Sequence, residues 1–143
     1  SVGFFGYTGK EVLSDLNILP VTSEINMYGP DLTIDIDEKL IINFQYVSRS
    51  DSKVLDESVV AEDIKTTGGF AEVVYAPKGD MSNWYLTGLF NWVDSDQSSL
   101  NYKSATLHAG YLLRRNLRVV GEVTRQMSGI QYNKISAGFV TAF

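Results

Sequence analysis

Hydrophobic and polar side chains alternate residue by residue along most of the chain from position 32 onward. In LTIDIDEKLIINFQYVS (32–48), apolar residues occupy every second position on both sides of Asp37-Glu38. A period of two residues predicts β-strands, because an amphipathic helix would repeat every 3.6 residues. The interruption at Asp37-Glu38 predicts a tight turn between two strands.

The same alternation predicts about eight strands. The first covers residues 2–9, and residues 24–28 begin the strand that ends at Ile36, with Gly29-Pro30 breaking its parity as a bulge or an edge residue would. The strands after the turn are 40–48, 69–77, 83–93, 102–113, 116–127 and 131–143. Gly68-Gly69 precedes a strand and not a helix, so we expect a bulge or a kink there instead of a phosphate-binding loop.

Short and long connections alternate between these strands. Short turns are expected at Asp37-Glu38, 77–82 and Arg114-Arg115, longer loops at 10–23, 51–66 and 94–100, and a short connection near Ser128-Gly129. The well-defined strands have about ten residues, the length that a tilted strand needs to cross a bilayer. This organisation is typical of membrane barrels. The predicted fold class is an all-β, antiparallel transmembrane β-barrel of about eight up-and-down strands, forming a single domain over residues 1–143.

The two faces of the predicted strands differ in chemistry. In strand 83–93, Trp84, Leu86, Gly88, Phe90 and Trp92 share one face, with a tryptophan near each end. Eight residues at ~3.3 Å each, tilted by ~40°, span about 20 Å along the membrane normal, so the two indoles can reach both interfacial girdles. The alternative is a soluble sandwich strand with two buried tryptophans. A lipocalin-like soluble barrel would invert the pattern, with an apolar cavity and a polar exterior.

This assignment of faces predicts two sets of residues. The membrane-interface anchors are Trp84, Trp92, Tyr111, Phe139 and Phe143. The ionisable residues that line the lumen are Asp35, Arg49, Glu72, His108, Arg118, Glu122 and Lys134. In a closed eight-stranded barrel these charges would have to pair, because side chains fill the interior. In a wider barrel they would line water and tune ion selectivity.

Composition removes several classes of function. A net charge of −5 argues against nucleic-acid binding, and the absence of cysteine excludes disulfides, zinc–thiolate sites and covalently attached haem. No apolar run approaches the roughly 18 residues of a spanning helix. No charged start followed by an apolar stretch is present at Ser1, so we expect an export signal to have been removed or the chain to be a piece of a longer protein.

Catalysis and metal binding find little support in the sequence. The single histidine, His108, faces inward in the predicted register, with Ser104 and Ser136 as possible neighbours. No acid that would orient it and no oxyanion donor can be identified. Glu122 lies on a strand adjacent to those of His108 and Lys134, so either could be its partner. We expect no enzyme activity, no metal site and no cofactor in this chain.

The last residues carry a resemblance to a known family. ISAGFVTAF (135–143) resembles the C-terminal strand of bacterial outer-membrane β-barrel proteins, which ends in Phe after hydrophobic residues at alternate positions. Thr141 departs from the pattern, because an aromatic or aliphatic residue is commoner there. The resemblance implies recognition of the Phe143 strand by the barrel assembly machinery, location in the bacterial outer membrane and both termini in the periplasm. Arg125 and Lys103 would then either pair with lipopolysaccharide phosphates or extend their charged groups to the membrane surface.

A second resemblance concerns barrel size. Residues 29–51 together with 104–125 are similar to the C-terminal part of larger porin-like barrels. The resemblance implies that this chain is the last eight strands of a wider barrel. The alternative is that the 143 residues close an eight-stranded barrel by themselves.

Three functional classes follow from these patterns. The first is a porin-like channel for passive diffusion of small polar solutes. The second is a closed eight-stranded barrel that acts as a structural anchor or a surface-interaction protein through its loops, including the acidic loop 51–66. The third is a scaffold or sheath for a partner protein. The expected partners are outer-membrane lipid, lipopolysaccharide, the assembly machinery and a possible protein partner, and no nucleic acid.

Overall fold

The computed structural model describes residues 1–15, 18–52, 55–56, 59–60 and 63–141. It contains one eight-stranded sheet in the order β1-β2-β3-β6-β7-β8-β9-β10 and a separate two-stranded sheet, β4-β5. The strands of the large sheet are β1 (Val2–Asp15), β2 (Ile18–Ile36), β3 (Leu40–Asp51), β6 (Ile64–Tyr75), β7 (Trp84–Ser95), β8 (Tyr102–Arg114), β9 (Leu117–Gln126) and β10 (Tyr132–Thr141). The short elements are β4 (Leu55–Asp56), β5 (Val59–Val60) and the 3-10 turns η1 (Gly79–Met81) and η2 (Ser98–Leu100).

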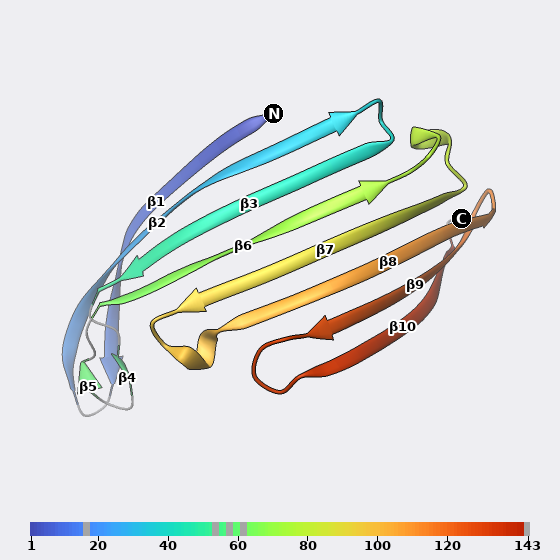
Figure 1. Cartoon of the computed structure of the whole chain (residues 1–143). Coiled ribbons are helices and arrows are strands. Elements are labelled where there is room, and N and C mark those ends of the chain that lie inside the picture. Colours follow the sequence, from blue (N-terminus) through green and yellow to red (C-terminus); the bar gives the residue numbers. More distant parts are fainter. Residues whose placement is uncertain (16–17, 53–54, 57–58, 61–62, 142–143) are drawn as a thin grey trace.

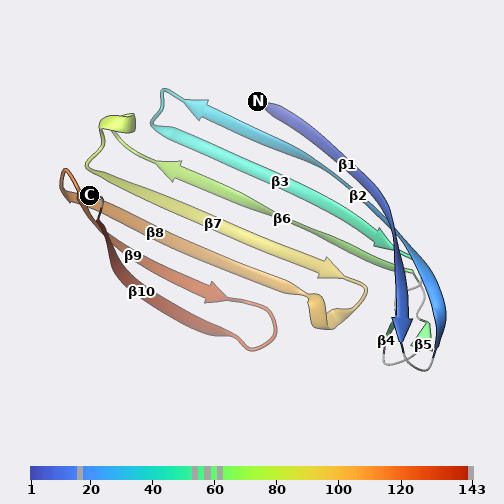
Figure 2. The same ribbon diagram turned by 180° about the vertical axis from the view of Figure 1, so that it is seen from behind.

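Neighbouring strands of the large sheet pair in antiparallel fashion and in chain order, so that β1 pairs only with β2 and β10 only with β9 among the described residues. This confirms the predicted all-β class and the up-and-down order. Figures 1 and 2 show the sheet from opposite sides as a curved surface with β1 and β10 at its two edges. No ladder joins β1 to β10 among the described residues, so the sheet is open along these two strands.

The predicted turn at Asp37-Glu38 is confirmed. Both residues have positive φ angles, 52° and 58°, which is the geometry of a type I′ hairpin turn. The N–H of Lys39 donates to the carbonyl of Ile36 (3.0 Å), and the N–H of Glu38 donates to Oδ1 of Asp35 (3.0 Å). The turn between β8 and β9 lies one residue later than predicted, at Arg115-Asn116, because β8 includes Arg114.

The predicted loop at 10–23 is wrong where the structure describes it. β1 continues to Asp15 and β2 begins at Ile18, so the ladder extends from the Val2–Leu32 pair to the Asp15–Ile18 pair. The segment contains strand-forming residues such as Val12, Val21 and Thr22, whose β propensity exceeds the turn signal of its polar neighbours. The loop at 51–66 is shorter than predicted, since β6 begins at Ile64, and it carries the β4–β5 ladder between described residues.

Neither predicted glycine irregularity is present. The β2–β3 register is the same before and after Gly29-Pro30, with pairs Tyr28–Ser48 and Asp31–Gln45, so no bulge occurs there. Gly68-Gly69 lies inside β6, where both neighbouring ladders are regular. A Cβ on Gly69 would lie 2.1 Å from the carbonyl oxygen of Gln45 and 2.9 Å from the indole of Trp92. The glycine makes room for close backbone approach and for the indole, and it does not mark a break in the strand.

The sheet separates its side chains into two chemically distinct faces. The apolar face, defined by Trp84, Leu107 and Phe139, is covered by large hydrophobic residues that remain exposed, and the polar face carries Glu72, His108 and Glu122. Among the described residues, no hydrophobic side chain is buried, and the buried polar side chains are those of Ser23 and Ser104. The sheet therefore has no packed core on either side. Soluble monomers rarely expose apolar surface on this scale.

Candidate functional site

All seven residues that the sequence predicts to line a lumen lie on the polar face. The pairs Asn43–Glu72, His108–Glu122 and Lys134–Thr124, combined with the two-residue period of each strand, fix this placement. The shared face also includes Asp35 on β2, Arg49 on β3 and Arg118 on β9. That this face borders a water-filled lumen stays a prediction.

Two of the seven residues interact locally, at opposite ends of the sheet. Asp35 accepts the N–H of Glu38 and so supports the β2–β3 turn. Arg49, at the other end of β3, donates from Nε to Oδ2 of Asp51 (2.7 Å) and from Nη2 to Oδ1 of Asp51 (2.7 Å). The ion pair joins positions i and i+2 on one strand, so it neutralises both charges without crossing the sheet.

Glu72 belongs to a polar row that crosses three neighbouring strands. Nδ2 of Asn43 donates to Oε1 of Glu72 (2.8 Å), and the hydroxyl of Thr33 donates to Oδ1 of Asn43 (3.0 Å). The row follows directly from the register, because Thr33, Asn43 and Glu72 occupy paired positions on β2, β3 and β6. It fixes the carboxylate of Glu72 on the polar face.

A second polar group, the central cluster, is formed by Tyr85, His108, Arg118 and Glu122. Oη of Tyr85 lies 2.9 Å from Nε2 of His108, and the two rings stack with centroids 5.5 Å apart. The Arg118 guanidinium lies over the Tyr85 ring, 5.3 Å from its centroid. Nδ1 of His108 is 3.6 Å from Oε2 of Glu122, which is ion-pair distance when the imidazole is protonated. Glu122 therefore has His108 as its partner.

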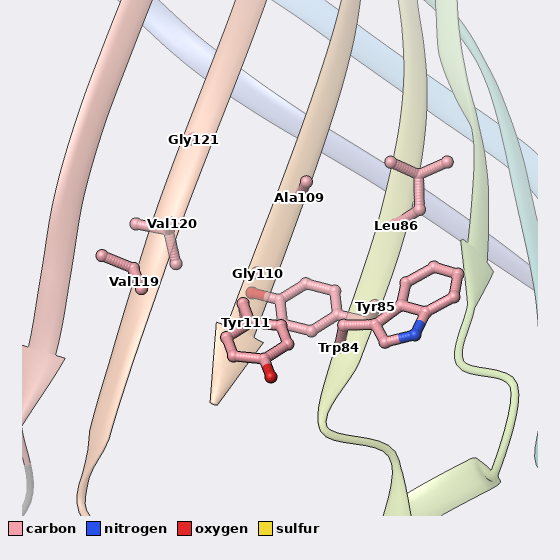
Figure 3. A pocket seen from close by; sticks show the side chains of 9 residues that line it. All are labelled: Trp84, Tyr85, Leu86, Ala109, Gly110, Tyr111, Val119, Val120 and Gly121. Atoms are coloured by element: carbon pink, nitrogen blue, oxygen red, sulfur yellow. The ribbon is translucent and has the colours of Figure 1, made fainter. Parts of the chain in front are cut away.

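Gly110 gives the Tyr85 ring its position. The two residues are paired across β7 and β8, and a Cβ on Gly110 would lie 2.3 Å from Cε1 of Tyr85. Figure 3 shows the ring of Tyr85 lying across β8 at Gly110. Any side chain at this position would displace the ring from His108. Tyr85 is not among the site residues expected from the sequence, although its place between Trp84 and Leu86 assigns it to the polar face.

Hydrogen bonds extend the central cluster toward the long-loop end of the sheet. The hydroxyls of Thr106 and Thr124 are 2.9 Å apart, and Thr124 donates to Oε1 of Glu122 (3.4 Å). Lys134 faces Thr124 across β9 and β10, and no ion pair of Lys134 is found in the described part of the chain. Lys134 thus contributes a positive charge near the cluster without neutralising Glu122.

A hollow of about 220 Å³ adjoins the cluster. His108, Val120, Glu122, Ser136 and Gly138 line it on the polar face. The imidazole and the carboxylate are both partly exposed, with 25% and 37% of their side-chain surface accessible. A small polar molecule or an ion on this face can therefore reach both groups.

Neither serine that the sequence offers as a neighbour of His108 lies beside it. Ser136 faces Glu122, which separates it from His108 by two inter-strand spacings, roughly 10 Å. Ser104 lies four residues from His108 along β8 and accepts a hydrogen bond from Asn91 (3.4 Å). Among the described residues, no group of three or more histidine, aspartate or glutamate side chains could hold a metal ion.

The predicted anchors lie on the apolar face wherever the structure describes them. Trp84, Tyr111 and Phe139 are in one row across the sheet, and Trp92 lies toward the other end of β7. Trp92 packs beside Phe90 and Phe44, with ring centroids 5.9 and 6.0 Å apart, and Trp84 meets Tyr75 edge to face at 5.9 Å. Phe143 lies outside the described residues.

In the described part of the chain, no helix has the length and apolar character needed to cross a membrane. Comparison with protein-family models, curated proteins and solved structures finds no match for this chain.

Proposed function

We propose that this sheet forms part of the wall of a porin-like outer-membrane β-barrel, which allows passive diffusion of small polar solutes and has no catalytic activity. The observation that carries the proposal is the separation of chemistry between the two faces of an open, antiparallel, up-and-down sheet. An apolar exterior and a polar interior on alternate residues is what such a barrel requires.

The apolar face supports contact with lipid. Leu107, Val123 and Ile135 are 55%, 48% and 79% exposed, and they lie in one row across β8, β9 and β10. Exposing this apolar surface to water would cost free energy, roughly 25 cal/mol for each Å². In hydrocarbon the cost disappears. The aromatic rings of Trp84 and Trp92 lie near opposite ends of β7 and take the positions of two interfacial girdles.

The unpaired edges support a barrel wider than these eight strands. β1 and β10 each have one side without a ladder among the described residues. Each unsatisfied backbone group in hydrocarbon costs several kcal/mol, so both edges have to be paired in a membrane. Because β1 and β10 do not pair with each other among the described residues, we assign further strands to both edges. With those strands in place the barrel is wide enough for a water-filled lumen, and the residues of the polar face select among solutes.

The orientation follows from the chain ends and from the longest connection, 52–63, which lies at the other end of the sheet. The three short turns and both described chain ends lie at one end of the sheet, since Ser1 pairs with Thr33 and Thr141 pairs with Leu117. We place this end in the periplasm and the long loops outside the cell. Lys103 and Arg125, on the apolar face toward the long loops, then contact lipopolysaccharide phosphates. The barrel assembly machinery recognises the C-terminal strand that ends at Phe143.

A closed eight-stranded barrel is the second candidate, and the central cluster favours it. Tyr85, His108, Arg118 and Glu122 contact one another, as side chains that fill a narrow interior have to do. Such a barrel would act as a structural anchor, a surface-interaction protein or a scaffold for a partner protein.

Single-channel recording in a planar lipid bilayer tests the proposal. Steady ohmic steps are the expected result, and Glu72→Gln is expected to reduce the preference for cations because it removes a carboxylate from the polar face. Asp94→Asn, which removes a carboxylate from the apolar face near the long loops, is the matched control with little expected effect. Silence from folded protein, identified by heat-modifiable gel migration, would reject the channel and favour the closed barrel.

A further inference from the structure

The apolar face contains a hollow of about 500 Å³ near the short turns. Leu86, Ala109 and Gly121 occupy paired positions and form its floor, while Trp84, Tyr111 and Val119 form the wall nearest the turns. Figure 3 shows the rings of Trp84 and Tyr111, from neighbouring strands, toward the same end of this hollow, with Leu86 and Ala109 farther along. On the side away from the turns, Leu107 and Val123 form a second apolar row.

A polar recess continues the hollow toward the turn between β6 and β7. It has a volume of about 170 Å³ and is lined by Pro77, Lys78, Ser82, Asn83, Trp84 and Tyr111. The two spaces share Trp84 and Tyr111, so an elongated ligand could occupy both. Ser82 Oγ accepts the backbone N–H of Lys78 (2.6 Å), which leaves the Ser82 hydroxyl proton available to a ligand. No ion pair of Lys78 is found among the described residues.

Charge is unevenly distributed among the three short turns. The segments 76–83 and 114–116, on either side of the recess, contain Lys78, Arg114 and Arg115 against the single acidic residue Asp80. The neighbouring turn between β2 and β3 contains Asp37 and Glu38 against Lys39, and its Glu38 side chain lies beside Gly79. Lys78 and the two arginines of the 114–116 turn, on the side of the recess away from Glu38, therefore supply the charge that attracts an anion.

We propose that this composite site binds one glycerophospholipid with an anionic headgroup, a proposal that rests on the membrane insertion proposed above. An acyl chain lies in the apolar hollow over Ala109 and Gly121. The phosphate lies in the recess, where the Lys78 ammonium and the Ser82 hydroxyl donate to its oxygens. A soluble anion would not use the hollow, and an uncharged hydrocarbon would not use Lys78. The combination of an apolar hollow and a cationic recess fits an amphiphile.

Quenching of tryptophan fluorescence by brominated lipids gives a direct test. The chain has two tryptophans, so the Trp92→Phe variant reports on Trp84 alone. The protein is inserted into vesicles that contain either brominated phosphatidylglycerol or brominated phosphatidylcholine at equal mole fraction. We expect the anionic lipid to bind beside Trp84 about fivefold more strongly, the effect of one lysine at a membrane surface.

Two pairs of variants separate the site from general attraction, all made in the Trp92→Phe background. Lys78→Gln is expected to abolish the preference for the anionic lipid, whereas Lys103→Gln, at the opposite end of the same face, should retain it. Ala109→Leu is expected to fill the hollow and weaken quenching by both lipids. Ala105→Leu makes the same substitution on the same strand and face, outside the hollow, and should leave quenching unchanged.

The outcomes distinguish this inference from the function on which it depends. Equal quenching by both lipids, or loss of the preference in Lys103→Gln to the same extent as in Lys78→Gln, would overturn the lipid site while leaving membrane insertion intact. Folded protein whose Trp84 is quenched by neither brominated lipid would overturn both proposals, because the apolar face would then not meet hydrocarbon.

Discussion

At the residue scale, the polar face depends on positions where a side chain is absent. Tyr85 contacts His108 and Arg118 because Gly110 has no side chain, so the Tyr85 ring can lie against the polar face of β8 at this position. The central cluster is therefore specified as much by this glycine as by its charged members. A glycine has a similar role on the apolar face, where the missing Cβ of Gly69 makes room for the indole of Trp92.

Replacing Gly110 by alanine should destabilise the protein by about 1–3 kcal/mol, because the new Cβ forces the Tyr85 ring away from His108. Gly88→Ala is the matched control on β7, since nothing lies within 4 Å of a Cβ there. We expect it to stabilise the strand by about 0.5–1 kcal/mol. Equilibrium unfolding from lipid vesicles measures both, and similar effects at the two positions would contradict the packing of Tyr85 on Gly110.

A second residue-scale prediction concerns the depth of each position in the bilayer. Leu107 pairs with Gly88, midway between the two tryptophans of β7, so Leu107→Arg should cost about 2–4 kcal/mol in the membrane. Val119 lies in the row of Trp84 and Tyr111, which the proposed barrel puts at the membrane interface, so Val119→Arg should cost no more than about 1 kcal/mol.

Thr106→Arg provides the control for Leu107→Arg, because Thr106 is the adjacent residue and lies on the polar face. The proposed lumen predicts a much smaller loss of unfolding free energy at Thr106 than at Leu107. Equal losses at these two neighbours would mean that the apolar face does not meet lipid.

At the element scale, the β2–β3 hairpin contains local strain that the rest of the sheet sustains. Asp37 and Glu38 both adopt positive φ, a conformation that residues with a Cβ disfavour. Asp35 compensates in part by accepting the N–H of Glu38. The turn is thus held by the ladder on either side of it and by one carboxylate, and not by turn residues of high propensity.

Exchanging Asp37-Glu38 for Asn-Gly, the preferred pair for a type I′ turn, should raise the unfolding free energy by about 1 kcal/mol. Asp35→Ala should lower it by about 0.5–1.5 kcal/mol, since the N–H of Glu38 loses its acceptor. Denaturant unfolding curves measure both changes. An Asn-Gly variant that is less stable than the natural chain would show that the positive φ angles are not strained.

At the scale of the whole molecule, the open edges are the dominant feature. Val2 and Phe4 on β1 are 81% and 72% exposed, and Ile135 and Phe139 on β10 are 79% and 74% exposed. Most apolar residues on the inner strands are better covered because they have neighbours on both sides. The exposure of the edges therefore reflects missing strand partners and not a difference in residue type.

Disulfide crosslinking can determine whether this chain closes on itself. The protein has no cysteine, so introduced pairs give an unambiguous signal. Cysteines at Val119 and Phe139, which face each other across β9 and β10, should crosslink and serve as the positive control. Cysteine at Phe4 should fail to crosslink to any position on β10 from Ile135 to Phe139. A crosslink within one chain would establish the closed eight-stranded barrel.

The alternation of side chains along the chain was enough to predict the strands, their order and their two faces. A period of two residues needs no tertiary information, because successive side chains on a strand point to opposite sides. All seven predicted polar-face residues, from Asp35 to Lys134, share one face of the sheet for this reason. Strand ends were less predictable: β1 and β2 extend past the polar residues near 10–23, because pairing with a neighbouring strand outweighs local turn signals.

The contacts between side chains on neighbouring strands could be identified only from the folded sheet. Alternation assigns Glu122 to a face but does not choose between His108 and Lys134 as its partner; the register and the side-chain geometry choose His108. The role of Gly110 depends on the Tyr85 ring, which the β7–β8 register places over it. The sequence alone predicts a bulge or a kink at Gly68-Gly69, but the ladders on both sides of this pair are regular. Contacts between strands depend on register, which is the alignment of segments that lie apart in the sequence. The alternation within one strand does not specify that alignment.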